Sequence, residues 1–314
     1  MYENRPQISV IMSIYNQKNK IQLDEAVQSI LHQTFQDFEF IIYNDGSDGE
    51  VYEFLQEYAL MDNRIVLINN PVNHGLAYSL NSCIDVARGK YLARMDDDDF
   101  CALDRLEVQY KYLEEHPEVA FVGSNAKLVD ENGNCWGVRK MPETPDELNF
   151  LRFSPYIHPT VMIRRSVFDG TITYCSSKEV LRCEDYELFM HLYKCDYRGY
   201  NIQQELIYYR EDNNSYKKRK FKYRIDEMRL RYRNFKELGI LFPVGWLFVI
   251  RPLLAAVTPS LLILGVKKLY HTFEKHFGER YEVQNENGNS SGAGKTSQEV
   301  SEDFESRTDA VGNI

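Results

Sequence analysis

The chain lacks the cysteine pattern of a disulfide-stapled or zinc-binding protein. Its 314 residues include six cysteines, but these show no paired spacing, and several fall inside strand-like or helix-like runs. This distribution argues against a disulfide framework and against a zinc site. It is the usage expected of a protein in a reducing cytoplasm.

The chain also lacks a secretory signal pattern and an excess of positive charge. Residues Met1–Pro6 are not a basic segment followed by an apolar one, so we expect no signal peptide. The net charge is −10, which is unfavourable for nucleic acid. Half of it, −5, comes from Gly278–Ile314, where eight acidic residues stand against three basic ones. The rest of the chain is only mildly acidic, and we predict no nucleic-acid partner.

What the chain does have is material for a large core, arranged in an alternating pattern. Hydrophobic residues make up 43% of it. From about Ile8 to Arg210, short β-rich runs alternate with helical patterns, which predicts an α/β fold with a largely parallel sheet. Strands are expected at 8–14, 38–43, 65–68, 91–95, 119–122 and 161–163. Helices are expected at 23–31, 76–87 and 103–115 and from about residue 185.

Four consecutive carboxylates follow the expected strand 91–95. Asp96–Asp99 would repel one another at the end of a strand, so a cation is expected to offset them. A hard divalent ion, Mg²⁺ or Mn²⁺, fits because it prefers oxygen ligands and often binds carboxylates together with substrate phosphates. The alternative is a solvated acidic turn that caps the next helix.

Other strand ends carry polar segments, two of which contain glycine. They are residues 13–16, 44–49 and 73–75. In open α/β sheets ligands bind beyond the carboxyl ends of the strands. Each segment alone is more simply an ordinary turn, but four on one edge of one sheet favour a binding site.

An ordered set of motifs resembles the family 2 glycosyltransferases of the GT-A fold. The matching segments are Ser9–Asn16, Gln28–Thr34, Asn44–Ser47, Asn73–Ala77, Ala87–Tyr91 and Asp96–Asp99, and the resemblance extends over Ile8–Arg210, roughly two thirds of the chain. It implies a Rossmann-like, mostly parallel central sheet flanked by helices. It also implies transfer of a sugar from a nucleotide-diphosphate donor, a UDP-sugar, to a carbohydrate or lipid-linked glycan acceptor of a bacterial cell-surface polysaccharide.

The resemblance assigns donor-side roles to individual residues. Tyr15 and Asp45 would hold the nucleotide base, because a tyrosine ring can stack on a pyrimidine and a carboxylate can accept its imide N–H. Asp96 would point to the ribose and, with Asp98, to a Mn²⁺ or Mg²⁺ ion. Arg94 would either neutralise the acids or approach the donor phosphates. Simpler interpretations are a packed aromatic for Tyr15 and a turn residue for Asp45.

Cys183–Leu188 resembles the acidic motif of the same family at the start of a helix. The resemblance assigns Asp185 as the catalytic base and Glu184 as a supporting residue. One base implies a single displacement with inversion at the anomeric carbon. The alternative for both acids is helix N-capping. His158 is a weaker candidate near the acceptor, since a lone histidine beside a proline is more often a loop residue.

The catalytic region is expected over residues 1–215, followed by a basic and apolar helical region at 216–277. Lys217–Arg224 is basic, and Ile240–Val266 is apolar but interrupted by Arg251, Pro252 and Pro259. We favour helices lying in the membrane interface over packing on the core, and both over a true span. The protein would then be peripheral on the cytoplasmic face of the cell membrane. The segment 278–314 has few apolar residues and is expected to be a disordered acidic tail.

Two other functions are consistent with the same fold class. A sugar-nucleotide nucleotidyltransferase would carry a glycine-rich loop after the first strand, but Ser13–Lys18 has no glycine. A catalytically silent, membrane-bound scaffold would not need Asp98 and Asp185, which are both present. An active glycosyltransferase is therefore the favoured interpretation.

Overall fold

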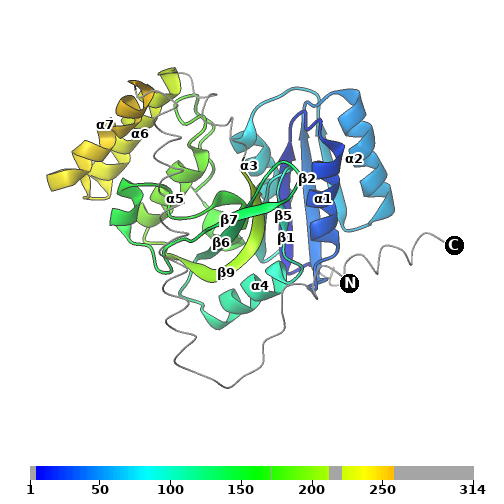
Figure 1. Cartoon of the computed structure of the whole chain (residues 1–314). Helices are drawn as coiled ribbons and strands as arrows, with labels where there is room; N and C mark the ends of the chain where they lie inside the picture. The colour runs from blue at the N-terminus through cyan, green and yellow to red at the C-terminus, as the bar shows by residue number, and fades with distance from the viewer. Residues whose placement is uncertain (1–4, 171, 212–220, 258–314) are drawn as a thin grey trace. The chain divides into compact units, whose positions relative to one another are not determined.

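A computed structural model describes residues 5–170, 172–211 and 221–257. Within them, a nine-stranded sheet has the order β3-β2-β1-β4-β8-β6-β9-β5, and β7 pairs with β6 (Figure 1). The strands are β1 (Ile8–Ile14), β2 (Phe38–Asp45), β3 (Ile65–Asn70), β4 (Tyr91–Met95), β5 (Phe100–Cys101), β6 (Phe121–Val129), β7 (Cys135–Arg139), β8 (Met162–Arg164) and β9 (Gly199–Arg210). The predicted α/β fold is confirmed.

Helices cover both faces of this sheet. They are α1 (Lys20–Leu31), α2 (Gly49–Met61), α3 (Leu76–Val86), α4 (Arg105–Glu115) and α5 (Glu184–Lys194), with short helical turns η1 (Glu147–Leu151), η2 (His158–Thr160) and η3 (Arg165–Phe168). Helices α1, α2 and α4 share a core with Val10 and Phe40, whereas α3 and α5 share one with Ile11 and Ile41. Adjacent strand residues point to opposite faces, so these are the two layers around the sheet.

The first four strands in space, β3-β2-β1-β4, form a parallel half-sheet. Strands β1 and β2 are buried along almost their whole length. A strand that is covered on both faces has a nearly continuous apolar sequence, rather than one in which apolar and polar residues alternate. These strands could therefore be recognised in the sequence.

The second half of the sheet is mixed. Strand β8 is antiparallel to β4 and β6, whereas the long strand β9 runs parallel to β6. At its far end β9 pairs antiparallel with the two-residue strand β5, which directly follows the acidic segment. Strand β9 therefore carries its last residue, Arg210, back to the end of β4.

One of the family motifs has a structural role at the amino end of the sheet. The Ser9 hydroxyl donates to Glu39 Oε1 at 2.6 Å, and the Gly89 N–H donates to Ser9 Oγ at 2.9 Å. The Arg88 guanidinium completes this cluster in an ion pair with Glu39 at 2.7 Å. A Cβ atom on Gly89 would lie 2.5 Å from the Ser9 nitrogen, so only glycine fits there. This motif joins β1, β2 and β4 rather than forming a binding site.

The C-terminal described elements are α6 (Phe221–Glu237), the π-helical turn η5 (Leu241–Gly245) and α7 (Trp246–Val257). Leu230 and Phe235 of α6, and Leu241 and Val249 beyond it, belong to the same core as α5. Residues Met1–Val257 form one compact unit. The described part of the region expected at 216–277, residues 221–257, thus packs on the core with one side. Residues 258–314, which include the expected acidic tail, lie outside the described residues.

Two expectations about the whole chain can be compared with this structure. All six cysteines are free thiols. Within the described ranges, no helix is both long enough and apolar enough to cross a membrane.

Candidate active site

The ends of β1, β2 and β4 lie together at one edge of the parallel half-sheet. Strand β1 pairs with both neighbours, and its register places Ile14 beside Asn44. Because parallel strands present their carboxyl ends at the same edge, Tyr15, Asp45 and Asp96 are brought together there. The structure thus gathers three candidate residues that are far apart in the sequence.

Tyr15 is the exposed aromatic residue of this edge, with 54% of its surface accessible. The next residue, Asn16, has a φ of +52° and is held on both sides. Its N–H donates to Ser47 Oγ at 3.0 Å, and its Oδ1 accepts from the Asp48 N–H at 3.0 Å. These bonds fix the loop after β1 against the loop after β2 and leave the Tyr15 ring accessible for stacking.

Asp45 is buried, with 1% of its surface accessible. Its two carboxylate oxygens accept the backbone N–H groups of His74 and Gly75, at 2.9 and 2.7 Å. A Cβ atom on the intervening Gly46 would lie 2.6 Å from the nitrogen of Asn73. The motifs at 44–47 and 73–75 are therefore two parts of one turn assembly, and Asp45 is the residue that joins them.

The acidic segment forms a compact group of oxygen ligands. Carboxylate oxygens of Asp96, Asp98 and Asp99 all lie within 4.8 Å of one another. Burial and then the charge of Asp96 raise the pKa of Asp98 to about 6, and burial and the neighbouring acids raise the pKa of Asp99 well above its usual range. A bound cation would remove this penalty, so these residues fit a divalent metal ion that prefers oxygen ligands.

The three acidic side chains differ in the ion pairs and hydrogen bonds that they already make. Asp96 forms an ion pair with Arg94. Asp99 is buried; its Oδ1 accepts the Arg210 N–H at 2.7 Å, and its Oδ2 has no hydrogen-bond partner among the described residues. Asp98 makes no ion pair with any side chain in the described ranges. Asp98 is therefore the carboxylate most available to a ligand.

Arg94 lies beneath the acidic segment rather than on its surface. Only 4% of the residue is accessible, and its Nε has no hydrogen-bond partner among residues 5–170, 172–211 and 221–257. Its charge also affects the carboxyl of Asp185 and the ring of His158. The sequence left two roles open for Arg94, namely neutralising the acids or approaching the donor phosphates. Its buried position and its ion pair with Asp96 favour the first role.

Arg210 is a residue of the site that sequence reasoning missed. In addition to its N–H bond to Asp99, its guanidinium donates to the backbone oxygen of Asp98 and pairs with Glu25. It is separated from Asp98 by more than a hundred residues and reaches it only because β9 is long. No local pattern in the sequence could have indicated this contact.

Asp185 lies in the first turn of α5, where Cys183 occupies the N-cap position. Burial raises the pKa of Asp185, and the adjacent Glu184 raises it further. The backbone N–H of Tyr186 and the charge of Arg94 act in the opposite direction. A carboxyl with a raised pKa is a better proton acceptor than an ordinary aspartate, which suits a general base. The N-cap residue itself is Cys183, but Glu184 and Asp185 are acids in the first turn of α5, so the stabilising role at the helix start that the sequence analysis gave as the alternative stays open beside the catalytic one.

His158 and Tyr174 form a buried pair beside these acids. His158 Nε2 lies 2.8 Å from the Tyr174 hydroxyl. Burial, together with the charge of Arg94, lowers the pKa of His158 well below its usual range, so the ring is neutral. The backbone N–H of Tyr174 donates to Asn81 Oδ1 at 2.9 Å, which fixes the irregular segment before α5 against α3.

Tyr174 was also missed by the sequence analysis. Burial raises its pKa, and the negative charges of Asp185 and Asp96 contribute in the same direction, so both acids act on its hydroxyl. Residues Ile172–Arg182 show neither helical nor strand periodicity, and a tyrosine there carries no recognisable signal. Its relation to Asp185 is visible only in three dimensions.

The structure thus places a group of carboxylates at one edge of an α/β sheet, and comparison with known proteins identifies the family of the chain. Residues 9–189 match the family model described as glycosyl transferase family 2. This is more than half of the chain. The chain belongs to glycosyl transferase family 2, and the resemblance found in the sequence is confirmed.

Two relatives illustrate the likeness. EpsE of Bacillus subtilis (strain 168), named as a glycosyltransferase, is 35% identical over 268 residues, covering 85% of this chain and 93% of EpsE. The O-antigen biosynthesis glycosyltransferase WbnJ of Escherichia coli is 33% identical over 215 residues, covering 67% of this chain and 82% of WbnJ. The protein is therefore a glycosyltransferase, with relatives in polysaccharide biosynthesis.

Solved structures show the same GT-A fold at low sequence identity. TarS 1–349 of S. aureus in complex with UDP-GlcNAc matches with a TM-score of 0.60 at 17% identity, over 78% of this chain and 79% of that one. The chain spans 65% of the UDP-bound form of that fragment and 43% of the longer TarS chain. The mannosyltransferase PcManGT of Pyrobaculum calidifontis, in complex with GDP-Man and Mn²⁺, matches with a TM-score of 0.56 at 15% identity, over 87% and 83%.

Proposed function

We propose that this protein transfers a sugar from a UDP-sugar to a carbohydrate or lipid-linked glycan acceptor, with inversion at the anomeric carbon. The observation that carries the proposal is the group formed by Asp96, Asp98 and Asp99, at the sheet edge that also presents Tyr15. Structures of the same fold with UDP-GlcNAc, and with GDP-Man and Mn²⁺, support a nucleotide-sugar donor and a divalent ion.

The donor nucleotide is proposed to bind at the ends of β1, β2 and β4. The exposed ring of Tyr15 offers a stacking face, and stacking of a base on an aromatic ring is worth about 1–3 kcal/mol in nucleic-acid systems. Asp45 fixes the 73–75 turn and offers its remaining lone pairs to the imide N–H of uracil. Asp96 is directed to the ribose, and Arg94 acts on the donor site through its ion pair with Asp96.

Asp98 and Asp96 are the proposed ligands of a Mn²⁺ or Mg²⁺ ion. When bound, the ion supplies positive charge that stabilises the negative charge developing on the leaving diphosphate. Arg210 holds the backbone of Asp98 and also the side chain of Asp99. Arg210 therefore fixes the backbone that carries Asp98, and Arg94 holds the side chain of Asp96.

Asp185 is the proposed general base. It accepts the proton of the acceptor hydroxyl while the hydroxyl oxygen bonds to the anomeric carbon. The bond from that carbon to the diphosphate oxygen breaks in the same step, and the diphosphate leaves with the electron pair. Attack from the side opposite the leaving group inverts the configuration. Glu184 supports this role because its charge keeps the pKa of Asp185 raised beyond the effect of burial.

We propose that the enzyme works at the cytoplasmic face of the cell membrane as a peripheral protein, with residues 1–215 as its catalytic region and 216–277 as its membrane-associating region. The relation to WbnJ, whose name places it in O-antigen biosynthesis, supports a cell-surface polysaccharide as the product. A membrane-associating C-terminal region would bring the catalytic region close to a lipid-linked acceptor.

Thermal unfolding in the presence of nucleotide sugars tests the proposal. UDP-glucose, UDP-galactose, UDP-GlcNAc and GDP-mannose are each added with Mn²⁺ or with chelator. We expect a UDP-sugar to raise the melting temperature with Mn²⁺ and not with chelator, because ligand binding to the folded state stabilises it. Equal stabilisation in chelator would contradict the metal assignment. Stabilisation by GDP-mannose alone would contradict the UDP assignment, and no response to any donor would favour a silent scaffold.

A further inference from the structure

The turn η5 and helix α7 expose a row of large apolar side chains. Phe242 is 75% accessible, and Val244, Trp246, Leu247, Ile250 and Leu254 are all exposed as well. In α7, Trp246, Ile250 and Leu254 are spaced by four residues, so they lie along one face of the helix. Exposed apolar patches of this kind mark interaction surfaces more often than scattered single residues do.

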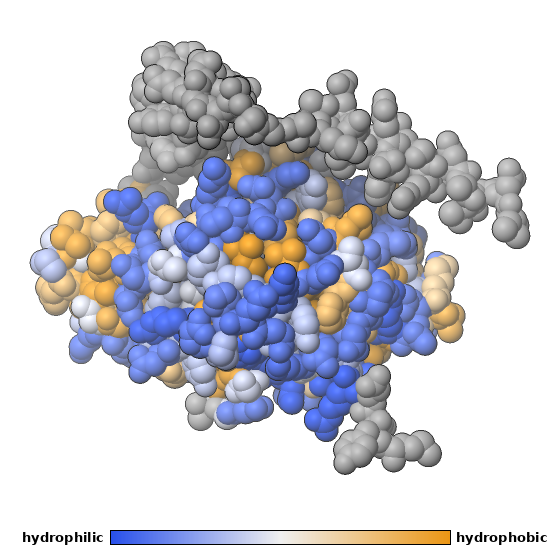
Figure 2. All heavy atoms as spheres, turned by 90° about the horizontal axis from the view of Figure 1, so that it is seen from below, coloured by the Kyte–Doolittle hydropathy of each residue, from blue (hydrophilic) through white to orange (hydrophobic). Residues whose placement is uncertain are grey.

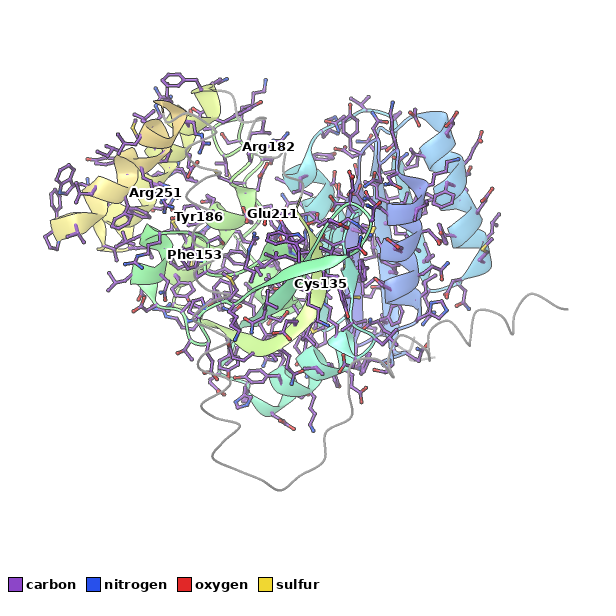
Figure 3. All side chains as sticks on the ribbon, viewed as in Figure 1. Cys135, Phe153, Arg182, Tyr186, Glu211 and Arg251 are labelled. Atoms are coloured by element: carbon purple, nitrogen blue, oxygen red, sulfur yellow. The ribbon has the colours of Figure 1, made fainter. Side chains whose placement is uncertain are left out.

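The opposite side of the same elements is firmly packed. Leu241 and Val249 are buried in the core that includes α5 and α6. The Arg251 guanidinium donates to the backbone oxygen of Arg152, and Figure 3 shows Arg251 near Phe153 and Tyr186. The exposed row is therefore the outer face of a docked helix. Figure 2 shows apolar atoms gathered at the left edge of the molecule, the side on which Figure 1 places α7.

Helix α6, which packs against α7, has an outer face of cations. Lys222, Arg229, Arg233 and Lys236 are all exposed, and their spacing of seven, four and three residues places them on one stripe. Between residues 221 and 254 there are seven basic and three acidic residues, although the whole chain carries a net charge of −10. Positive charge is thus concentrated on the helix that packs against α7.

We propose that the η5–α7 row and the α6 stripe together form a docking surface for an anionic lipid bilayer. Apolar side chains that enter the interface, next to cations that meet anionic head groups, are the chemistry of an interfacial helix. A second copy of this chain is a less suitable occupant, because two cationic stripes, in which Arg229 is partly neutralised by Asp226, would then face and repel each other. This inference rests on the proposed function, because docking to a membrane would give the enzyme access to the lipid-linked acceptor proposed there.

Vesicle sedimentation with the full-length protein tests the surface without any sugar donor or acceptor. We expect binding to vesicles that contain phosphatidylglycerol, weaker binding to pure phosphatidylcholine, and partial loss in high salt. The double variant Phe242→Ser/Leu247→Ser should reduce binding to anionic vesicles by about tenfold or more. The charge variant Arg233→Glu/Lys236→Glu should reduce binding to anionic vesicles and leave binding to phosphatidylcholine unchanged.

The control variant is Leu60→Ser/Met61→Ser at the end of α2, where both side chains are highly exposed at 88% and 77%. It should bind vesicles as the wild type does. An equal loss of binding in the control Leu60→Ser/Met61→Ser and in Phe242→Ser/Leu247→Ser, or no binding by the wild type, would overturn the proposal. If the wild type is a dimer that does not bind vesicles, and Phe242→Ser/Leu247→Ser is a monomer, the occupant of the surface is a second copy of the chain and the proposal is wrong. Because Mn²⁺-dependent stabilisation by a UDP-sugar is measured separately, failure here is distinguishable from failure of the proposed function.

Discussion

On the donor side of the candidate active site, three of the acidic side chains are held by specific partners, whereas the proposed base is held mainly by its own helix. Asp45 accepts two backbone N–H groups, Asp96 pairs with Arg94, and Asp99 accepts the Arg210 N–H. Asp185 makes no ion pair with any side chain in the described ranges, and its pKa is raised by burial and by Glu184.

This difference matches the different tasks of the two sides. Donor binding requires oxygen atoms in a set geometry, so Asp45, Asp96 and Asp99 are held in place, while Asp98 stays available to a ligand. A general base has to gain a proton, and strong cation pairing would lower its pKa and weaken it as a base. Variants on the donor side should therefore change donor binding, and variants of Asp185 should change turnover alone.

The largest effect is expected for Asp98→Asn. The amide keeps the size of the side chain but removes the charge of the most available carboxylate. Transfer should fall by about 10³-fold, and metal-dependent UDP binding should weaken in parallel. Initial rates of sugar transfer and titration of UDP with and without Mn²⁺ measure the two effects.

The matched control is Asp97→Asn, which makes the same chemical change one position earlier. Asp97 is outside the converging group of carboxylates. Its variant should retain Mn²⁺-dependent UDP binding and most of the transfer rate. If the two variants behave alike, the acidic segment acts through its total charge and not through Asp98.

Replacing the proposed base, Asp185, should affect turnover and not donor binding. Asp185→Asn keeps the shape of the first turn of α5 but cannot accept the acceptor proton. Turnover should fall by about 10²-fold or more while the affinity for the donor stays near that of the wild type. Donor titration and single-turnover rates separate the two quantities. A collapse of donor binding would move Asp185 to the donor side and leave the base unassigned.

The same contrast explains what could be predicted from the sequence. Strands β1, β2 and β4 are buried and largely apolar, β3 begins with an apolar run, and the strands are linked by short helical units, so their order and their polar ends could be inferred from local patterns. The segments that hold Tyr15, Asp45, Asp96 and Asp98 follow directly from those ends, and the family resemblance assigned the donor-side roles of these residues. The family resemblance added Asp185, which no local pattern would distinguish from a capping residue.

The remaining residues depend on contacts that have no local pattern. Arg210 reaches Asp98 along the whole length of β9, and Tyr174 reaches His158 from an irregular segment fixed to α3 by Asn81. The mixed pairing of β8, β6 and β9 likewise depends on long connections whose registry a single sequence does not specify. Tertiary packing decides these features, so they required the structure.

The smallest effect is expected for Glu184→Gln, and it appears in a pH profile. Burial is the main cause of the raised pKa of Asp185, and the charge of Glu184 adds to it. Removing that charge should lower the pKa of Asp185, so the base would lose its proton at lower pH. The acid limb of turnover against pH should therefore move to lower pH, with a rate on the alkaline plateau close to that of the wild type. Asp185→Asn should have no such limb. If the limb does not move in Glu184→Gln, or persists in Asp185→Asn, another group titrates in the reaction and the assignment of Asp185 as the base is wrong.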